Sequence, residues 1–271
     1  MILECLLYID YLQYSRTSGK RKSFNIRNFF MNTVEIILIA LFCVFQSIFG
    51  VGLLLLGTPT FLLIGYNFFE VLNILLPYSI VISLIQIFIN KKQNFKFGKK
   101  ILIHSIPFLI LGLIIVEYIQ YKINFILIAS IFLIIFPVLN IRNFKKKKIK
   151  IKNLNFSLKL LGLFHGLTNL GGSLLTIISS NVGKDKNIIR YNISSGYFIF
   201  AIFQLLLINI FFNQLNFVYL KFIWLPIIIF ILSQKFFKKI NDLLYYNLLN
   251  IFTLSYGIYI FVDIIYSRFV D

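Results

Sequence analysis

Eight long apolar runs separated by short polar gaps limit this chain to one kind of fold. Most of them match the ~20 residues that a helix needs to cross the hydrocarbon of a bilayer. The chain has 59% hydrophobic and 13% charged residues and a mean hydropathy of +0.88. So much apolar surface cannot be buried in one water-soluble core. Lipid is therefore the expected solvent, and the sequence predicts an all-α, multi-pass protein of the cell (inner or plasma) membrane. The runs are Val34–Ile64, Val71–Ile89, Ile101–Tyr118, Ile123–Ile141, Phe156–Ser179, Ile188–Phe212, Phe217–Ser233 and Leu243–Ile265.

Two glycine-rich breaks, Gln46–Pro59 and His165–Ser173, interrupt the first and fifth runs. A shift of 119 positions (165 − 46) superposes the breaks without a gap. The pairs in this register are Gln46 with His165, Gly52 with Gly171, Asn73 with Asn192, Ile74 with Ile193, Tyr78 with Tyr197 and Pro107 with Pro226. One shared register predicts a duplicated membrane unit whose backbone opens at equivalent places, as in many carriers of small solutes.

The duplication divides the chain into parts with different expected roles. Residues 31–141 form the first membrane repeat, residues 142–155 a basic cytoplasmic linker, and residues 156–271 the second repeat. Residues 1–30 combine a short apolar patch with a basic stretch and are expected to be an extension outside the fold, which would start near Met31. The alternative is an amphipathic N-terminal arm on the membrane surface.

The positive charges of equivalent gaps point to opposite sides of the membrane. Lys91–Lys100 is basic after the second run of the first half, whereas Asn213–Asn216, its counterpart, carries no charge. Positive loops lie in the cytoplasm, so the two halves are predicted to be inverted repeats. Basic gaps on both sides of the fifth run further suggest a re-entrant hairpin that reverses at Asn169–Gly172, with the first run doing the same from the other face. Eight ordinary crossings remain the alternative.

The two breaks supply a polar, glycine-lined set of residues that could bind a small anion. Opened helices present free N–H groups and positive dipole ends, which bind an anion without a full positive charge. The competing interpretation is that small and hydroxylated residues simply pack membrane helices. The candidate substrate-binding residues are Gln46, Ser47, Gly50, Gly52, Thr58, Pro59, Asn73, His165, Thr168, Asn169, Gly171, Gly172, Ser173, Asn192 and Ser195.

Two kinds of candidate side chain have more specific expectations. Asn73 and Asn192 lie in apolar helices and should face the protein interior, where each could bind substrate or bridge helices. His165 changes charge near neutral pH and could accept the proton of a coupled anion–proton step, or it could serve as an ordinary helix contact.

Several other classes of function lack their sequence signatures. The chain has no phosphate-binding Gly-x-x-x-x-Gly-Lys loop and no paired zinc motif, so neither a cofactor nor a metal is expected. The formal charge of +18 comes from Lys and Arg in the gaps, where they orient the chain and meet anionic headgroups, so no nucleic acid is expected. Gly171-Gly-Ser173 hints at an intramembrane serine protease, but Leu174 follows the serine and both histidines precede it. An enzyme is therefore not expected.

The chain resembles the TauE/SafE family of sulfite-exporter-like permeases. The resemblance rests on Phe49-Gly-Val-Gly52 with Thr58-Pro59, on Gly166-Leu-Thr-Asn-Leu-Gly-Gly172, and on the basic turn Lys235–Lys239 before the last run. It implies a secondary transporter for a small anion such as sulfite, an organosulfonate or a related organic acid, and it is compatible with a homo-oligomer. Leu53, Leu54 and Asn169 depart from the glycines usual in the family. The alternatives are a non-transporting membrane scaffold or assembly subunit, and an intramembrane enzyme.

Overall fold

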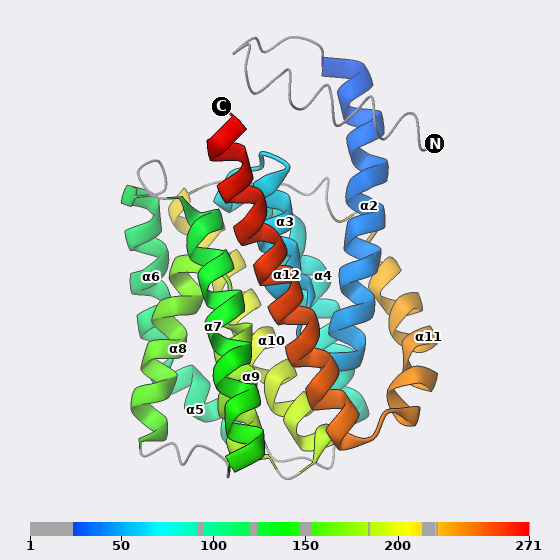
Figure 1. Cartoon of the computed structure of the whole chain (residues 1–271), viewed down its shortest axis with the longest axis vertical. Helices are drawn as coiled ribbons and strands as arrows, with labels where there is room; N and C mark the ends of the chain where they lie inside the picture. The colour runs from blue at the N-terminus through cyan, green and yellow to red at the C-terminus, as the bar shows by residue number, and fades with distance from the viewer. Residues whose placement is uncertain are drawn as a thin grey trace. The chain divides into compact units, whose positions relative to one another are not determined.

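The computed structural model describes residues 24–90, 95–119, 124–146, 153–183, 185–212, 220 and 222–270. Within them the regular elements longer than one turn are α-helices (Figure 1). The site described below lies within residues 39–271, which form one compact unit. The helices are α2 (Phe24–Phe49), α3 (Leu53–Leu63), α4 (Phe68–Ile89), α5 (Lys96–His104), α6 (Ile106–Ile119), α7 (Phe125–Lys146), α8 (Leu154–Thr168), α9 (Gly172–Val182), α10 (Lys186–Phe212), α11 (Leu225–Lys239) and α12 (Asp242–Val270).

Each apolar run of the sequence overlaps one or more of the described helices. The first run divides into α2 and α3 and the fifth into α8 and α9, so helix ends fall at both predicted breaks. The run Ile101–Tyr118 is also broken, by a 45° bend between α5 and α6 that the sequence analysis did not foresee. Within the described residues, α4, α10 and α12 are long and apolar enough to cross a membrane, and the bent pair α5–α6 would make a fourth span.

The predicted start of the fold near Met31 and the predicted linker of residues 142–155 do not coincide with helix ends. Helix α2 begins at Phe24, before the predicted start of the fold near Met31, and residues 1–23 lie outside the described part. Helix α7 continues into the predicted basic linker as far as Lys146, while residues 147–152 also lie outside it. The division of the chain into an extension, two repeats and a linker stays a prediction.

The order of helices repeats with the offset found in the sequence. Helix α9 starts 172 − 53 = 119 positions after α3 and ends 182 − 63 = 119 positions after it, and α11 starts 225 − 106 = 119 positions after α6. Equivalent helices also pack against each other, since α4 lies against α10 and α7 against α12 (Figure 1).

The helices α7 and α12 run antiparallel. A Cβ atom added to Gly257 of α12 would lie 2.7 Å from Cβ of Leu133 in α7. Four residues further along α7, Pro137 lines the same pocket as Asn250 and Thr253, which come earlier in α12. Residue numbers that rise along one helix while they fall along the other define an antiparallel pair.

Glycines bring the backbones of α6 and α8 into direct contact. A Cβ atom on Gly162 would collide with the carbonyl oxygen of Ser105, and one on Gly166 with that of Leu109. A Cβ atom on Gly112 would lie 2.7 Å from the carbonyl oxygen of Leu163. This is the small-xxx-small packing by which membrane helices gain close van der Waals contact.

Candidate functional site

The first break depends on two glycines with left-handed backbone. Helix α2 ends at Phe49, and Gly50 and Gly52 adopt φ values of +77° and +149° before α3 begins. L-residues rarely adopt such angles. A side chain on Gly52 would also place its Cβ atom 2.5 Å from that of Phe45, so the chain can turn here only because Gly52 has no side chain.

Side chains from neighbouring helices hold the end of α2. The Gln86 Nε2 group of α4 donates to the carbonyl oxygens of Gln46 (2.8 Å) and Ser47 (3.1 Å). The Tyr245 hydroxyl of α12 donates to the carbonyl of Phe49 at 2.5 Å. These bonds satisfy carbonyls that have no partner inside the helix, which every helix C-terminus leaves behind.

The second break uses an asparagine and two glycines instead. Asn169 ends α8 in the left-handed conformation, with φ +59°, which Asn tolerates better than most residues. Two side chains of α8 then accept hydrogen bonds from the opened backbone. His165 Nδ1 accepts from the N–H of Gly171 at 3.2 Å, and Thr168 Oγ1 accepts from the N–H of Leu170 at 3.1 Å.

The two breaks are joined by a fully buried hydrogen bond. Asn169 Nδ2 donates to Thr58 Oγ1 of α3 at 2.8 Å. From α10, Gln204 Nε2 donates to Asn169 Oδ1 at 3.4 Å. Neither Thr58 nor Asn169 is exposed to any measurable extent. The structure therefore brings the two breaks into contact at this pair.

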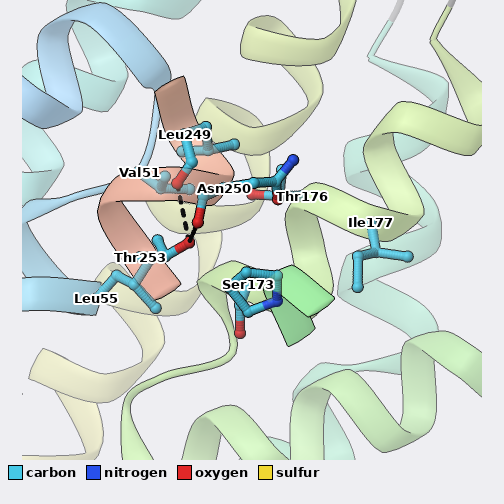
Figure 2. A pocket seen from close by; sticks show the side chains of 9 residues that line it. Val51, Leu55, Ser173, Thr176, Ile177, Leu249, Asn250 and Thr253 are labelled. Carbon is cyan, nitrogen blue, oxygen red and sulfur yellow. Dashed lines mark hydrogen bonds between the residues drawn. The ribbon is translucent and has the colours of Figure 1, made fainter. Parts of the chain in front are cut away.

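A small pocket is lined by residues from the beginnings of α3 and α9 and from α7 and α12 (Figure 2). Its volume is about 10 Å³, which is room for one water molecule. The N-cap residues of the two helices, Gly52 and Gly171, are glycines and have no side chain to cap the first turn, while the N–H of Gly171 itself donates to His165. The pocket is lined by Val51, Leu55, Pro137, Ser173, Thr176, Ile177, Leu249, Asn250 and Thr253.

A second pocket of about 10 Å³ shares part of this lining. It is bordered by Gly52 and by aromatic residues of α2 and α12, and it has Val51, Leu55, Leu249 and Thr253 in common with the first. The apolar walls and the few hydroxyl and amide groups give an enclosed site with orienting polar contacts, as small-ligand sites usually have.

Most of the predicted residues lie in the breaks but do not line a pocket. Ser173 lines the first pocket and Gly52 the second, while Thr58 and Asn169 form the junction. Gln46 instead ties α2 to α4, because its Nε2 group donates to the hydroxyls of Ser79 (2.9 Å) and Ser83 (3.1 Å). The remaining predicted residues, which line neither pocket, are Ser47, Gly50, Pro59, Asn73, His165, Thr168, Gly171, Gly172, Asn192 and Ser195.

The paired asparagines face the protein interior, as predicted. Asn73 and Asn192 are each 4% exposed. Asn73 Nδ2 donates to the carbonyl of Phe69, one turn earlier in its own helix. Neither asparagine lines either pocket, so their role in substrate binding stays a prediction.

His165 has a fixed orientation in the second break. Its ring lies 4.6 Å from that of Phe200 and 6.0 Å from that of Tyr197, and it is fully buried. Because Nδ1 accepts the bond from Gly171, the ring proton belongs on Nε2 in this arrangement. Proton coupling through this residue stays a prediction.

The sequence analysis missed several polar residues that the fold brings to the site. Asn250 and Thr253 reach the pocket from α12, and Thr176 reaches it from α9. Asn250 and Thr253 are three positions apart in an apolar run and so share one helix face, which is a signal that the sequence carries. The last such residue is Arg190, which lies within the apolar run Ile188–Phe212 and is 2% exposed against the first break.

In the described residues, no group of three His, Cys, Asp or Glu side chains is placed to hold a metal ion.

Comparisons with known proteins identify the family of the chain. No curated protein and no solved structure matches the chain. The model of one protein family, described as sulfite exporter TauE/SafE, matches residues 36–260. This span covers both breaks and most of the sequence, and the chain therefore belongs to the TauE/SafE family of membrane transporters.

Proposed function

We propose that this chain is a secondary permease for a small anion such as sulfite, an organosulfonate or a related organic acid. The anion binds at the pocket between the two breaks. The observation that carries this proposal is that the beginnings of α3 and α9, whose N-cap residues are glycines without a capping side chain, border one pocket lined by residues of both breaks. Family membership supports transport, and the pocket supports where it occurs.

The electrostatics of the pocket favour a negative ligand. The first N–H groups of α3 and α9 have no partner within their own helices, and each helix start carries roughly half a positive charge. The hydroxyl groups of Ser173, Thr176 and Thr253 donate to nearby backbone carbonyls in this arrangement, and they would have to turn to the anion to bind it without adding charge. Such a site binds an oxyanion and still releases it, because none of the residues that line the pocket carries a full positive charge.

The small volume of the pocket supports alternating access. A space of about 10 Å³ holds a water but not an oxyanion of four heavy atoms, so this arrangement is occluded and the anion enters only after the breaks move apart. The antiparallel packing of α7 and α12, which are equivalent in the 119-residue register, supports inverted halves that rock against each other.

Replacing one pocket serine tests the site. Ser173→Ala should lower the uptake of labelled sulfite into proteoliposomes by about 3- to 10-fold at subsaturating concentration, the effect of one lost hydrogen bond of about 0.5–1.5 kcal/mol. Ser180→Ala is the matched control. Both serines lie on α9 and donate to a carbonyl three residues earlier, but Ser180 lies outside the pocket.

The outcomes separate transport from the alternatives. Flux that is equal in both serine variants would remove the pocket from the proposal. Absence of anion flux in the unaltered, correctly inserted chain would overturn the permease function itself and favour a scaffold. Running the same vesicles with sulfite, methanesulfonate and acetate ranks the three classes of anion.

A further inference from the structure

Arg190 is a buried cation without an acidic partner in the described part of the chain. It belongs to the first turns of α10 and is 2% exposed. Its Nη1 group donates to the carbonyl of Ser47 (3.3 Å) and to Gln234 Oε1 (3.2 Å), and its guanidinium stacks 3.4 Å above the ring of Phe237. All three partners are neutral, and the Nε–H group is buried with no hydrogen-bond partner.

A buried charge of this kind demands a reason. Removing an unpaired cation from water is expensive, and ionisable residues inside membrane helices usually mark the path of an ion or substrate. The C-terminal dipole of α2 offsets part of the charge of Arg190, but amounts to only about half an elementary charge.

The duplicated fold does not require an arginine at this position. The equivalent residue of the first half is Val71 (190 − 119), which is fully buried in α4. The same helix pair therefore accommodates a valine on one side and an arginine on the other. The charge is a property of the second half alone, which points to a role in a ligand site rather than in packing.

Arg190 contacts the segment that separates it from the pocket. A Cβ atom on Gly50 would lie 3.3 Å from Cγ of Arg190, so the arginine stem packs directly on the first break. The next residue, Val51, lines both pockets. The glycine that contacts the arginine stem is therefore adjacent in sequence to a residue of the pocket lining.

We infer that Arg190 binds the transported oxyanion and supplies the positive charge of the site. The inference rests on the proposed function. The planar fork of Nε–H and Nη–H matches two oxygens of a sulfite or sulfonate group, which lysine cannot reproduce. In the occluded arrangement Ser47 and Gln234 occupy the Nη1 donor, and the anion replaces them when the first break moves.

Binding of labelled sulfite to the full chain in nanodiscs tests the inference. Arg190→Gln should weaken binding by about 10- to 100-fold, the effect of losing charge-assisted hydrogen bonds, and Arg190→Lys should weaken it less. Lys186→Gln is the control. Lys186 lies one turn away and stacks on the same Phe237 ring, but it donates to the carbonyls of Phe237 and Ile240 and not to the first break. We expect its affinity to stay within about 2-fold of the unaltered chain.

Ligand charge separates binding from a purely structural role. In mildly alkaline buffer sulfite is doubly charged and methanesulfonate is singly charged. Measured by competition, the affinity for sulfite should fall more in Arg190→Gln than the affinity for methanesulfonate. An equal loss for both would mean that Arg190 only supports the fold. If Arg190→Gln does not fold, Gln234→Ala decides, because it frees the Nη1 donor and should tighten sulfite binding several-fold. Unchanged or weaker binding in that variant overturns the inference.

The inference and the proposed function fail in different ways. Sulfite binding that is equally tight in the unaltered chain and in Arg190→Gln would remove Arg190 from the site and leave the permease standing. Absence of binding in the unaltered chain would overturn the proposed function and, with it, the role of Arg190.

Discussion

At the scale of single residues, Asn169 has two separable roles at the junction of the breaks. Its backbone ends α8 in the left-handed region, and its side chain donates to Thr58. Glycine can take over the first role but not the second. Asparagine in place of glycine therefore adds a buried side-chain bond between the two breaks.

A double-mutant cycle measures that bond. With Thr58→Val and Asn169→Gly, the unfolding free energies should show a coupling of about 0.5–1.5 kcal/mol. Asn169→Ala should cost about 1 kcal/mol more than Asn169→Gly, because alanine is strained in the left-handed region. Unfolding by SDS in mixed micelles gives the free energies. A coupling near zero would mean that the hydrogen bond is not formed in the folded protein.

At the scale of elements, the contact between α6 and α8 depends on glycine more than any other part of the described fold outside the breaks. Gly162→Ala should destabilise the protein by about 1–3 kcal/mol, because the added methyl group has only the Ser105 carbonyl to meet and the two backbones must separate. SDS unfolding measures the change. Ser157→Ala on the same helix, where the hydroxyl bonds only to its own helix, is the control. Equal unfolding midpoints for both variants would contradict the close packing.

The sequence predicted elements well where local chemistry decides them. Glycines inside apolar runs located both helix breaks, because only glycine relieves the backbone angles found at Gly50 and Gly52. The bend at Ser105 was missed, since it contains no glycine and is stabilised by a bond from the Ser105 hydroxyl to the Leu158 carbonyl, 53 residues away. The place of Arg190 beside the first break was missed for the same reason, because it depends on tertiary contacts such as the bond to the Ser47 carbonyl, 143 residues away.

At the scale of the whole molecule, the pocket combines residues from segments that the repeat places far apart in sequence. Asn250 and Thr253 have no polar counterpart in the first half, where the equivalent positions are Ile131 and Ile134 (250 − 119 and 253 − 119). In the proposed twofold arrangement the two halves would present different side chains to one site, which would hold an asymmetric ligand in a defined orientation. The arrangement of the halves therefore matters for which way the anion faces.

Labelling of single cysteines from each side of the membrane tests whether the halves are inverted. Lys99→Cys, Asn187→Cys and Asn67→Cys place exposed thiols after α4, at the start of α10 and before α4, in a background without Cys5 and Cys43. Inverted halves predict that an impermeant maleimide reaches positions 99 and 187 from the cytoplasm and position 67 from outside, because both basic gaps then lie on the cytoplasmic side. Halves with the same orientation would instead place positions 187 and 67 on the same side of the membrane, because each lies at the start of an equivalent helix. That result would remove the structural basis for alternating access by two rocking repeats, while the pocket and the Arg190 site would keep their own tests.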